Sequence, residues 1–132
     1  MSSTTPLDVF VENLLAAMFF ETDDEKAIQA FEAGLSEDIR IEVNGAILPR
    51  PVYLGIVKGI RKDNVATDLG NPTLAMHVED AEKQTGTVAQ CGKFTLKNKS
   101  TGEEKTSSAG TIAKVEFRDG KRVMTSLTEV MS

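Results

Sequence analysis

Few side chains in this sequence are suited to nucleophilic or proton-transfer chemistry near neutral pH. The chain has one histidine, one cysteine and one tyrosine, and it has no tryptophan. A single cysteine excludes an internal disulfide and a multi-cysteine zinc site, and a single histidine excludes a histidine-rich metal site. The sequence also lacks a Gly-x-Ser-x-Gly elbow, a phosphate-binding glycine loop and a His-Glu-x-x-His motif. We therefore expect no metal and no cofactor.

Glu129 is the first candidate for proton transfer. It shares one face of a predicted strand with Val123, Thr125 and Leu127. A carboxyl group on such a face loses water, which raises its pKa and suits it to act as a general acid or base. The alternative is that Glu129 lies beyond the sheet, in a frayed C-terminal end.

His77 is the second catalytic candidate, because imidazole titrates near neutrality without any shift. The apolar residues Leu74, Met76 and Val78 alternate with it along the chain. If this trio faces the interior, His77 lies on the outer face of the sheet, at a dimer contact. If a bulge reverses the register, His77 and Glu79 enter a pocket together and form an acid–base pair.

Two further polar side chains are candidates for positioning a ligand. Gln90 shares a strand face with Val88 and Phe94, so its amide could orient a ligand carbonyl or form a structural hydrogen bond. Tyr53 lies on the apolar stripe of a predicted helix. Its hydroxyl could enter a pocket while its ring packs in the core, or the ring could serve packing alone.

Helical spacing dominates the first half of the chain. Apolar residues recur every three to four positions from Leu7 to Met18, after a Thr5-Pro6 start typical of a helix cap. The segment Thr22–Glu25 repeats the capping pattern and opens a second helix, which Gly34 ends. A strand, a loop with two prolines and a third helix follow, over residues 39–43, 45–51 and 52–63.

After residue 64 the apolar period changes to that of strands. Alternation predicts four of them, over residues 74–79, 88–96, 111–117 and 123–129. Asp119-Gly120 indicates a tight hairpin between the last two, and the polar stretch Lys97–Ser108 is short enough for one hairpin loop with its flanks. The order of elements predicts an α+β domain with helices packed on one face of a curved sheet.

Length and charge set further limits. With 132 residues and 40% hydrophobic residues, the range 1–132 fits one domain that buries a sizeable core. The net charge of −5 argues against nucleic acid as a partner. The longest apolar run, Leu14–Phe20, is far shorter than a membrane helix, and the N-terminus does not have the pattern of a secretory signal. We therefore expect a cytoplasmic protein that binds neither nucleic acid nor membrane.

The sequence resembles the SnoaL-like branch of the nuclear transport factor 2-like superfamily in four features. These are the helix pair, the segment Gly34–Gly45, the short helix around Gly55 and the closing strands joined at Asp119-Gly120. The resemblance implies a cone, with three N-terminal helices packed on a curved, mainly antiparallel sheet and an apolar pocket at the open end. It also implies a homodimer through the outer sheet face, where Ile112 points outward. The superfamily includes steroid isomerases, polyketide cyclases, dehydratases and non-catalytic binding proteins, so the fold does not select a chemistry.

The catalytic slots of the steroid isomerases, as the resemblance places them, fall on the apolar residues Leu14, Val43 and Ala113. Isomerisation by that mechanism needs a tyrosine and two aspartates there, so the sequence argues against it. An alignment error of one residue would bring in polar residues instead, namely Asn13, Glu42, Asn44 or Lys114. The full set of predicted ligand contacts is Tyr53, Gln90, Leu14, Val43, Ala113, Val115, Phe117, Thr125 and Leu127.

Two functional hypotheses remain open from the sequence. In the first, the protein binds an apolar, polycyclic metabolite and catalyses an isomerisation, cyclisation or dehydration, with Glu129 and His77 transferring protons. In the second, the protein is a non-catalytic homodimeric module that binds an apolar ligand or serves interaction alone. The number of polar groups that converge in the pocket separates the two.

Overall fold

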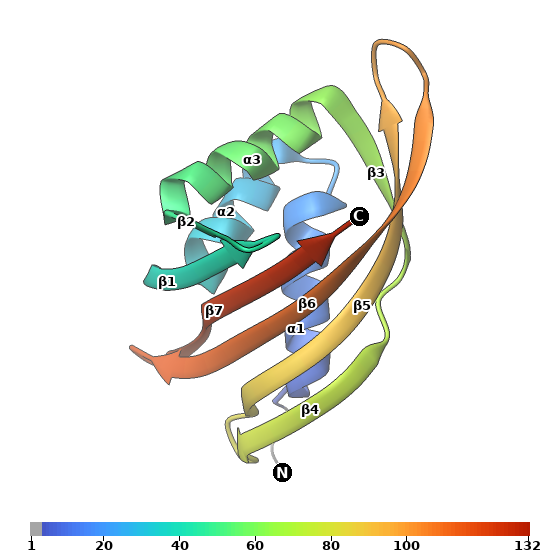
Figure 1. Cartoon of the computed structure of the whole chain (residues 1–132). Helices are drawn as coiled ribbons and strands as arrows, with labels where there is room; N and C mark the ends of the chain where they lie inside the picture. The colour runs from blue at the N-terminus through green and yellow to red at the C-terminus, as the bar shows by residue number, and fades with distance from the viewer. Residues whose placement is uncertain (1–3) are drawn as a thin grey trace.

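The computed structural model describes residues 4–132. Helical spacing in the sequence predicts each of its helices, which are α1 (Leu7–Phe19), α2 (Asp24–Gly34) and α3 (Arg50–Asp63). Figure 1 shows α1 crossing behind the sheet and α3 running along its upper edge. Within residues 4–132, no helix has the length and apolar character needed to cross a lipid bilayer.

The N-terminal caps of α1 and α2 each lie one residue after the predicted position. Asp23 caps α2, because its side chain accepts hydrogen bonds from the backbone N–H groups of Glu25 and Lys26 at 3.0 and 3.2 Å. The N-cap of α1 is Pro6, which has no side-chain acceptor, so the expected Thr5 cap is wrong. Gly34 does end α2, as predicted.

The strands form one seven-stranded sheet within the described residues. Its order is β2-β1-β7-β6-β5-β3, and β4 pairs with the other half of β5. The strands are β1 (Leu35–Val43), β2 (Ala46–Leu48), β3 (Asn64–Gly70), β4 (Thr73–Asp80), β5 (Thr85–Asn98), β6 (Glu104–Arg118) and β7 (Lys121–Met131).

The strand β7 lies between β1 and β6 and joins the two halves of the sheet. It runs parallel to β1, with Val43 opposite Glu129, and antiparallel to β6, with Thr111 opposite Glu129. The other strand pairs are antiparallel. Asp119 and Gly120 both adopt positive φ, 51° and 82°, which confirms the predicted tight turn between β6 and β7.

The expectation of an α+β domain with a curved, mainly antiparallel sheet is confirmed, but three details differ. The helix α3 follows β1 and β2, so it is a mid-chain helix and only α1 and α2 are N-terminal. The strands β2 and β3 occupy segments in which the sequence predicts no strand. The strands β5 and β6 also continue through most of the polar stretch Lys97–Ser108, which we expected to hold one hairpin loop with its flanks.

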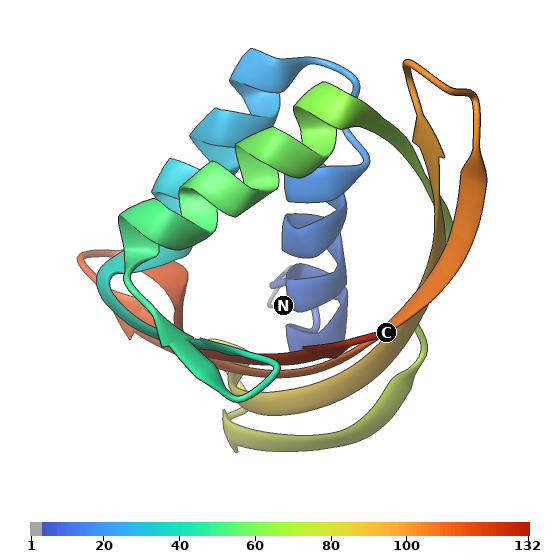
Figure 2. The same ribbon diagram turned by 45° about the horizontal axis from the view of Figure 1, so that its top comes forward.

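The helices lie inside the curve of the sheet, as Figure 2 shows. The core between the two layers combines residues from all three helices with the inward faces of the strands. Its fully buried members include Leu7, Val11, Met18, Phe31, Ile41, Tyr53, Val57, Ala113, Met124 and Leu127. The convex face of the sheet carries exposed apolar side chains, among them Ile47, Ile112 and Val130.

Candidate functional site

A cavity of about 220 Å³ lies between the C-terminal half of α1 and the concave side of the sheet. The end of α1 with its following residue forms one wall, through Leu15, Ala16, Phe19 and Phe20, and Ile60 of α3 extends it. The strands form the other wall, with Ala66, Asp68, Gly92, Lys93, Phe94, Leu96, Lys105, Ser107, Ala109, Thr111, Glu129 and Met131. Glu12, Asn71 and Ser132 complete the lining.

The cavity exists because the helix is shorter than the strands that it covers. The 13 residues of α1 span about 20 Å, whereas the 15 residues of β6 span about 50 Å along the strand. Beyond the end of α1, the concave side of β5 and β6 therefore has no helix packed directly on it. Figure 1 shows these two strands continuing upward beside α3.

Glu129 lies in the lining and is almost fully buried, with 3% of its surface exposed. The hydroxyl of Tyr53, on α3, donates a hydrogen bond to its Oε1 atom. The other oxygen, Oε2, accepts no hydrogen bond from any residue that the structure describes. Glu129 thus presents one anchored and one free oxygen, and only the free one is available to a ligand.

Burial sets the acid–base properties of this pair. It raises the pKa of the Glu129 carboxyl above its ordinary value, and the hydrogen bond from Tyr53 opposes the shift only in part. Burial and the neighbouring carboxyl also raise the pKa of the Tyr53 phenol well above its ordinary value. Tyr53 therefore keeps its proton and donates it in the hydrogen bond to Glu129.

Comparison with known proteins gives the fold. Neither a family model nor a curated protein matches the sequence. A ketosteroid isomerase-like protein from Erwinia carotovora atroseptica matches in structure with a TM-score of 0.70, at 12% identity over 95% of this chain and 92% of that chain. A protein of the nuclear transport factor 2-like type, of unknown function, from Exiguobacterium matches with a TM-score of 0.67, at 17% identity over 93% and 98%. This chain has the nuclear transport factor 2-like fold.

A third neighbour with this fold is a candidate polyketide cyclase from Xanthomonas campestris pv. campestris. It matches with a TM-score of 0.63, at 16% identity over 94% of this chain and 91% of that chain. The expected resemblance to nuclear transport factor 2-like, polyketide cyclase and ketosteroid isomerase-like proteins is therefore confirmed at the level of the fold. Identities this low say nothing about which reaction, if any, the chain catalyses.

The predicted isomerase slots have no polar group in this nuclear transport factor 2-like cone. Leu14 and Ala113 are buried in the core, and Val43 pairs with Glu129 across neighbouring strands. The polar residues one position away do not enter the cavity lining either. Those residues are Asn13, Glu42, Asn44 and Lys114.

Gln90 is fully buried beside the cavity but is engaged within the protein. Its side-chain N–H donates to the backbone carbonyl of Asp8 at 2.9 Å, and its carbonyl accepts from Asn71 at 2.8 Å. Asn71 itself lines the cavity. Gln90 therefore ties α1 to the sheet and holds Asn71 at the wall.

His77 lies outside the site. It pairs with Thr87 of β5, whose neighbour Val88 faces the core, so both His77 and Thr87 lie on the convex face. The register shifts in the pairing of β4 with β5 fall between Thr73 and Ala75 and between Val78 and Asp80, on either side of His77. His77 itself lies in the regular stretch between them, so neither shift turns its side chain inward. Of the two placements of His77 that the sequence leaves open, the structure has the outer sheet face, and the sheet separates His77 from Glu129.

The remaining predicted ligand contacts are not part of the cavity lining. Val115 and Leu127 are fully buried in the core. Thr125 is buried at an irregularity in the pairing of β6 with β7. Phe117 is 43% exposed, and the ammonium group of Lys83 lies 4.6 Å from the centre of its ring.

Sequence reasoning missed the upper part of the site, on β6. Lys105, Ser107 and Thr111 alternate along the concave face of that strand and all line the cavity. The sequence places Thr111 on an inward strand face, but Lys105 and Ser107 fall in the stretch that we expected to be a loop. The alternation with Glu104, Thr106 and Ser108 was the available signal, and it was hidden because both faces are polar.

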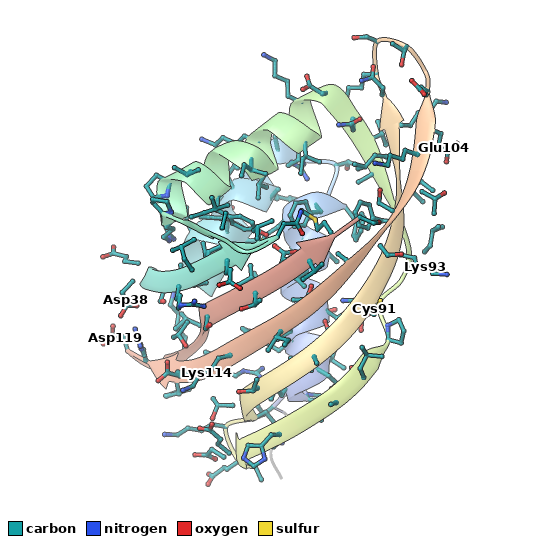
Figure 3. The ribbon with its side chains drawn as sticks, in the orientation of Figure 1. Asp38, Cys91, Lys93, Glu104, Lys114 and Asp119 are labelled. Atoms are coloured by element: carbon teal, nitrogen blue, oxygen red, sulfur yellow. The ribbon has the colours of Figure 1, made fainter. Side chains whose placement is uncertain are left out.

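The lysine Lys105 and the acidic residues Asp68 and Glu12 of the cavity lining do not form ion pairs with one another. Within residues 4–132, no ion pair joins Lys105 to Asp68 or Glu12, the acidic side chains of the rim. Asp68 accepts a hydrogen bond from the backbone N–H of Gly70 at 2.8 Å. Figure 3 shows Lys93 pointing outward from β5, away from the helices. Lys105 is therefore the cation that β6 directs to the cavity side.

Proposed function

We propose that this protein binds an apolar small molecule in the cavity and that Glu129 transfers a proton to or from it. The observation that carries the proposal is the buried carboxyl of Glu129 at the wall of a mainly apolar cavity, held by Tyr53 and with Oε2 free. Reactions of this class are isomerisation, cyclisation and dehydration, in which a carbon-bound or oxygen-bound proton moves. The structural neighbours described as ketosteroid isomerase-like and as a candidate polyketide cyclase support the choice of class.

The geometry assigns separate roles to the two residues of the pair. Oε2 of Glu129 removes or delivers the proton, because Oε1 is occupied by the Tyr53 hydroxyl. Tyr53 positions the carboxyl and does not itself reach the lining. The apolar wall of Leu15, Phe19 and Phe94 would pack on the ligand and keep water from the reacting atoms.

Nitrobenzisoxazole offers a direct test, because its ring opening needs only a desolvated base. The base takes the proton from the ring carbon, the C–H electron pair forms the nitrile, and the N–O bond breaks to release a coloured phenolate. We expect the wild-type protein to accelerate this reaction and Glu129→Gln to lose the acceleration by about a hundredfold. Glu79→Gln, the same change at an exposed position of β4 outside the cavity lining, is the matched control and should leave the rate unchanged.

The pH dependence sharpens the test. Glu129 acts as a base only when ionised, and burial raises its pKa. The rate should therefore rise with pH through a value above that of an ordinary carboxyl group. Tyr53→Phe removes the hydrogen bond that lowers this pKa, so its profile should move to higher pH. A rate that is equal in the wild type and in Glu129→Gln would overturn the proposal.

The alternative function, a non-catalytic homodimeric module, is favoured by one feature of the convex face. Ile112, Val130 and Ile47 are each more than half exposed there, on three strands. We propose that a second copy of the chain covers this face, which leaves the cavity free in either functional case. Sedimentation equilibrium of the wild type and of Ile112→Glu tests it: we expect a dimer that the charge dissociates, and a wild-type monomer would exclude it.

A further inference from the structure

A row of polar side chains runs along the strand wall of the cavity and ends at Glu129. Lys105, Ser107 and Thr111 follow one another on the concave face of β6, and Glu129 is the cross-strand partner of Thr111. The facing wall, from α1 and α3, is apolar except for Glu12 at the rim. A molecule that fills this cavity would therefore meet polar groups on one side and hydrocarbon on the other.

Lys105 stands at the far end of this row from Glu129. It pairs with Leu96 of β5, and Leu96 pairs in turn with Ala66 of β3. Both of these apolar partners line the cavity, so the exposed side chain of Lys105 extends from a strand surface that is apolar beside it. Lys105 lies six positions before Thr111, which is at most about 20 Å along the strand.

The ammonium group of Lys105 has no partner of its own. Within residues 4–132, neither an ion pair nor a hydrogen bond engages its side chain. Asp68 pairs with Phe94, so it lies two strands away and in a different row from Lys105. A ligand that covered Lys105 with hydrocarbon alone would remove its water without replacement, which is costly for a charge.

We propose that the ligand of this cavity is an elongated apolar acid whose carboxylate binds Lys105 while its reacting group lies at Glu129. This inference rests on the proposed function, because it assigns the orientation of the ligand in the same cavity. The ion pair replaces the water that the bound ligand would remove from the exposed ammonium group. The hydroxyls of Ser107 and Thr111 have no hydrogen-bond partner within residues 4–132, and they offer hydrogen bonds to polar groups between the two ends. The charge thus fixes which end of the molecule reaches the base.

Two dyes that differ by one anionic group test the pairing. N-phenylnaphthylamine and anilinonaphthalene sulfonate share an aromatic frame, and both fluoresce when water is excluded. We expect the wild type to bind the sulfonate more tightly. Lys105→Met should reduce that preference by about tenfold, equivalent to about 1.4 kcal/mol, without weakening the neutral dye. Lys105→Arg should retain the preference.

The matched control is Lys97→Met, on the same hairpin but on the opposite strand face. Lys97 pairs with Glu104 and is exposed. Its replacement by methionine changes the net charge of the protein by the same amount as Lys105→Met does. If Lys97→Met weakens the sulfonate as much as Lys105→Met does, the preference reflects overall charge and the inference is wrong. Ala109→Phe, which places a ring in the cavity, should abolish binding of both dyes and so distinguish surface binding from cavity binding.

A second arm tests a carboxylate directly, against a neutral amide of the same chain length. Octanoate should displace the neutral dye at lower concentration than octanamide, and Lys105→Met should remove this difference. Equal displacement by the two compounds in the wild type would overturn the carboxylate assignment. The inference fails, while the proposed function stands, if the neutral dye binds and nitrobenzisoxazole reacts but Lys105→Met changes the binding of none of the probes. If the neutral dye does not bind at all, the proposed function fails and the inference falls with it.

Discussion

The two halves of β6 present the same strand face to different surroundings. In the lower half, Ala113 and Val115 lie against the helices and have essentially no exposed surface. In the upper half, Lys105, Ser107 and Ala109 lie on the same face but line the cavity. Thr111 and its partner Glu129 stand at the boundary between the two halves.

The difference shows that the length of α1, and not the strand itself, decides where the site lies. Where the helix covers the sheet, the strand face must be apolar and close-packed. Where the helix has ended, the same face can carry polar groups because a ligand or water meets them. In this chain β6 therefore has a half that packs in the core and a half that lines the cavity, on one continuous strand.

The largest expected effect comes from placing a charge in each half. Ala113→Asp buries a carboxylate without a partner, and we expect it to lower the free energy of unfolding by about 3–5 kcal/mol or to prevent folding. Ala109→Asp makes the same change beside the cavity, where the carboxylate keeps access to water, and should cost less than about 1 kcal/mol. Urea denaturation of the two variants measures both values. Equal losses would show that the two halves do not differ.

The boundary residue Glu129 should give stability a pH dependence. Its pKa in the folded protein is raised, so the unfolded chain loses this proton more readily than the folded one. The stabilisation is complete below the ordinary carboxyl value and is lost as the pH rises through the raised value. Glu129→Gln cannot ionise, so it should become more stable than the wild type toward higher pH.

Urea denaturation at a series of pH values from acid to neutral tests this expectation. The unfolding midpoints of the wild type and Glu129→Gln should diverge as the pH increases, in favour of the variant. Two curves that stay parallel would mean that the carboxyl group of Glu129 titrates in the folded protein as it does in the unfolded chain.

The smallest effect is expected from His77 on the convex face. His77→Ala removes an exposed side chain that does not line the cavity, so nitrobenzisoxazole turnover and binding of the neutral dye should change by less than about twofold. A larger loss of turnover would place His77 in the reaction and would contradict the separation of the two sheet faces.

The sequence predicts the parts of this fold that have a packed apolar face. The stripes of α1 and the alternation around Val115 follow from burial against a neighbouring layer, and the Asp119-Gly120 turn follows from its own backbone preference. The strand β3 was missed because its segment Asn64–Gly70 has little apolar alternation and is mostly exposed.

The same reasoning explains which part of the candidate site was found. Glu129 stands out because it interrupts an apolar face, and its partner Tyr53 lies on an apolar helix stripe. Lys105 and Ser107 do not interrupt an apolar pattern in the sequence, because their stretch of β6 borders a cavity on one side and solvent on the other. Their position depends on where α1 ends in space, which local periodicity does not report.

The position of β7 between β1 and β6 has a consequence for how the protein folds. Tyr53 and Glu129 are 76 residues apart in the sequence, so their hydrogen bond forms only after β7 has entered the middle of the sheet. Contacts of this sequence separation make the search for the native topology slow. We therefore expect helix formation to precede the main folding step, and the acid–base pair and the cavity to appear together in that final step.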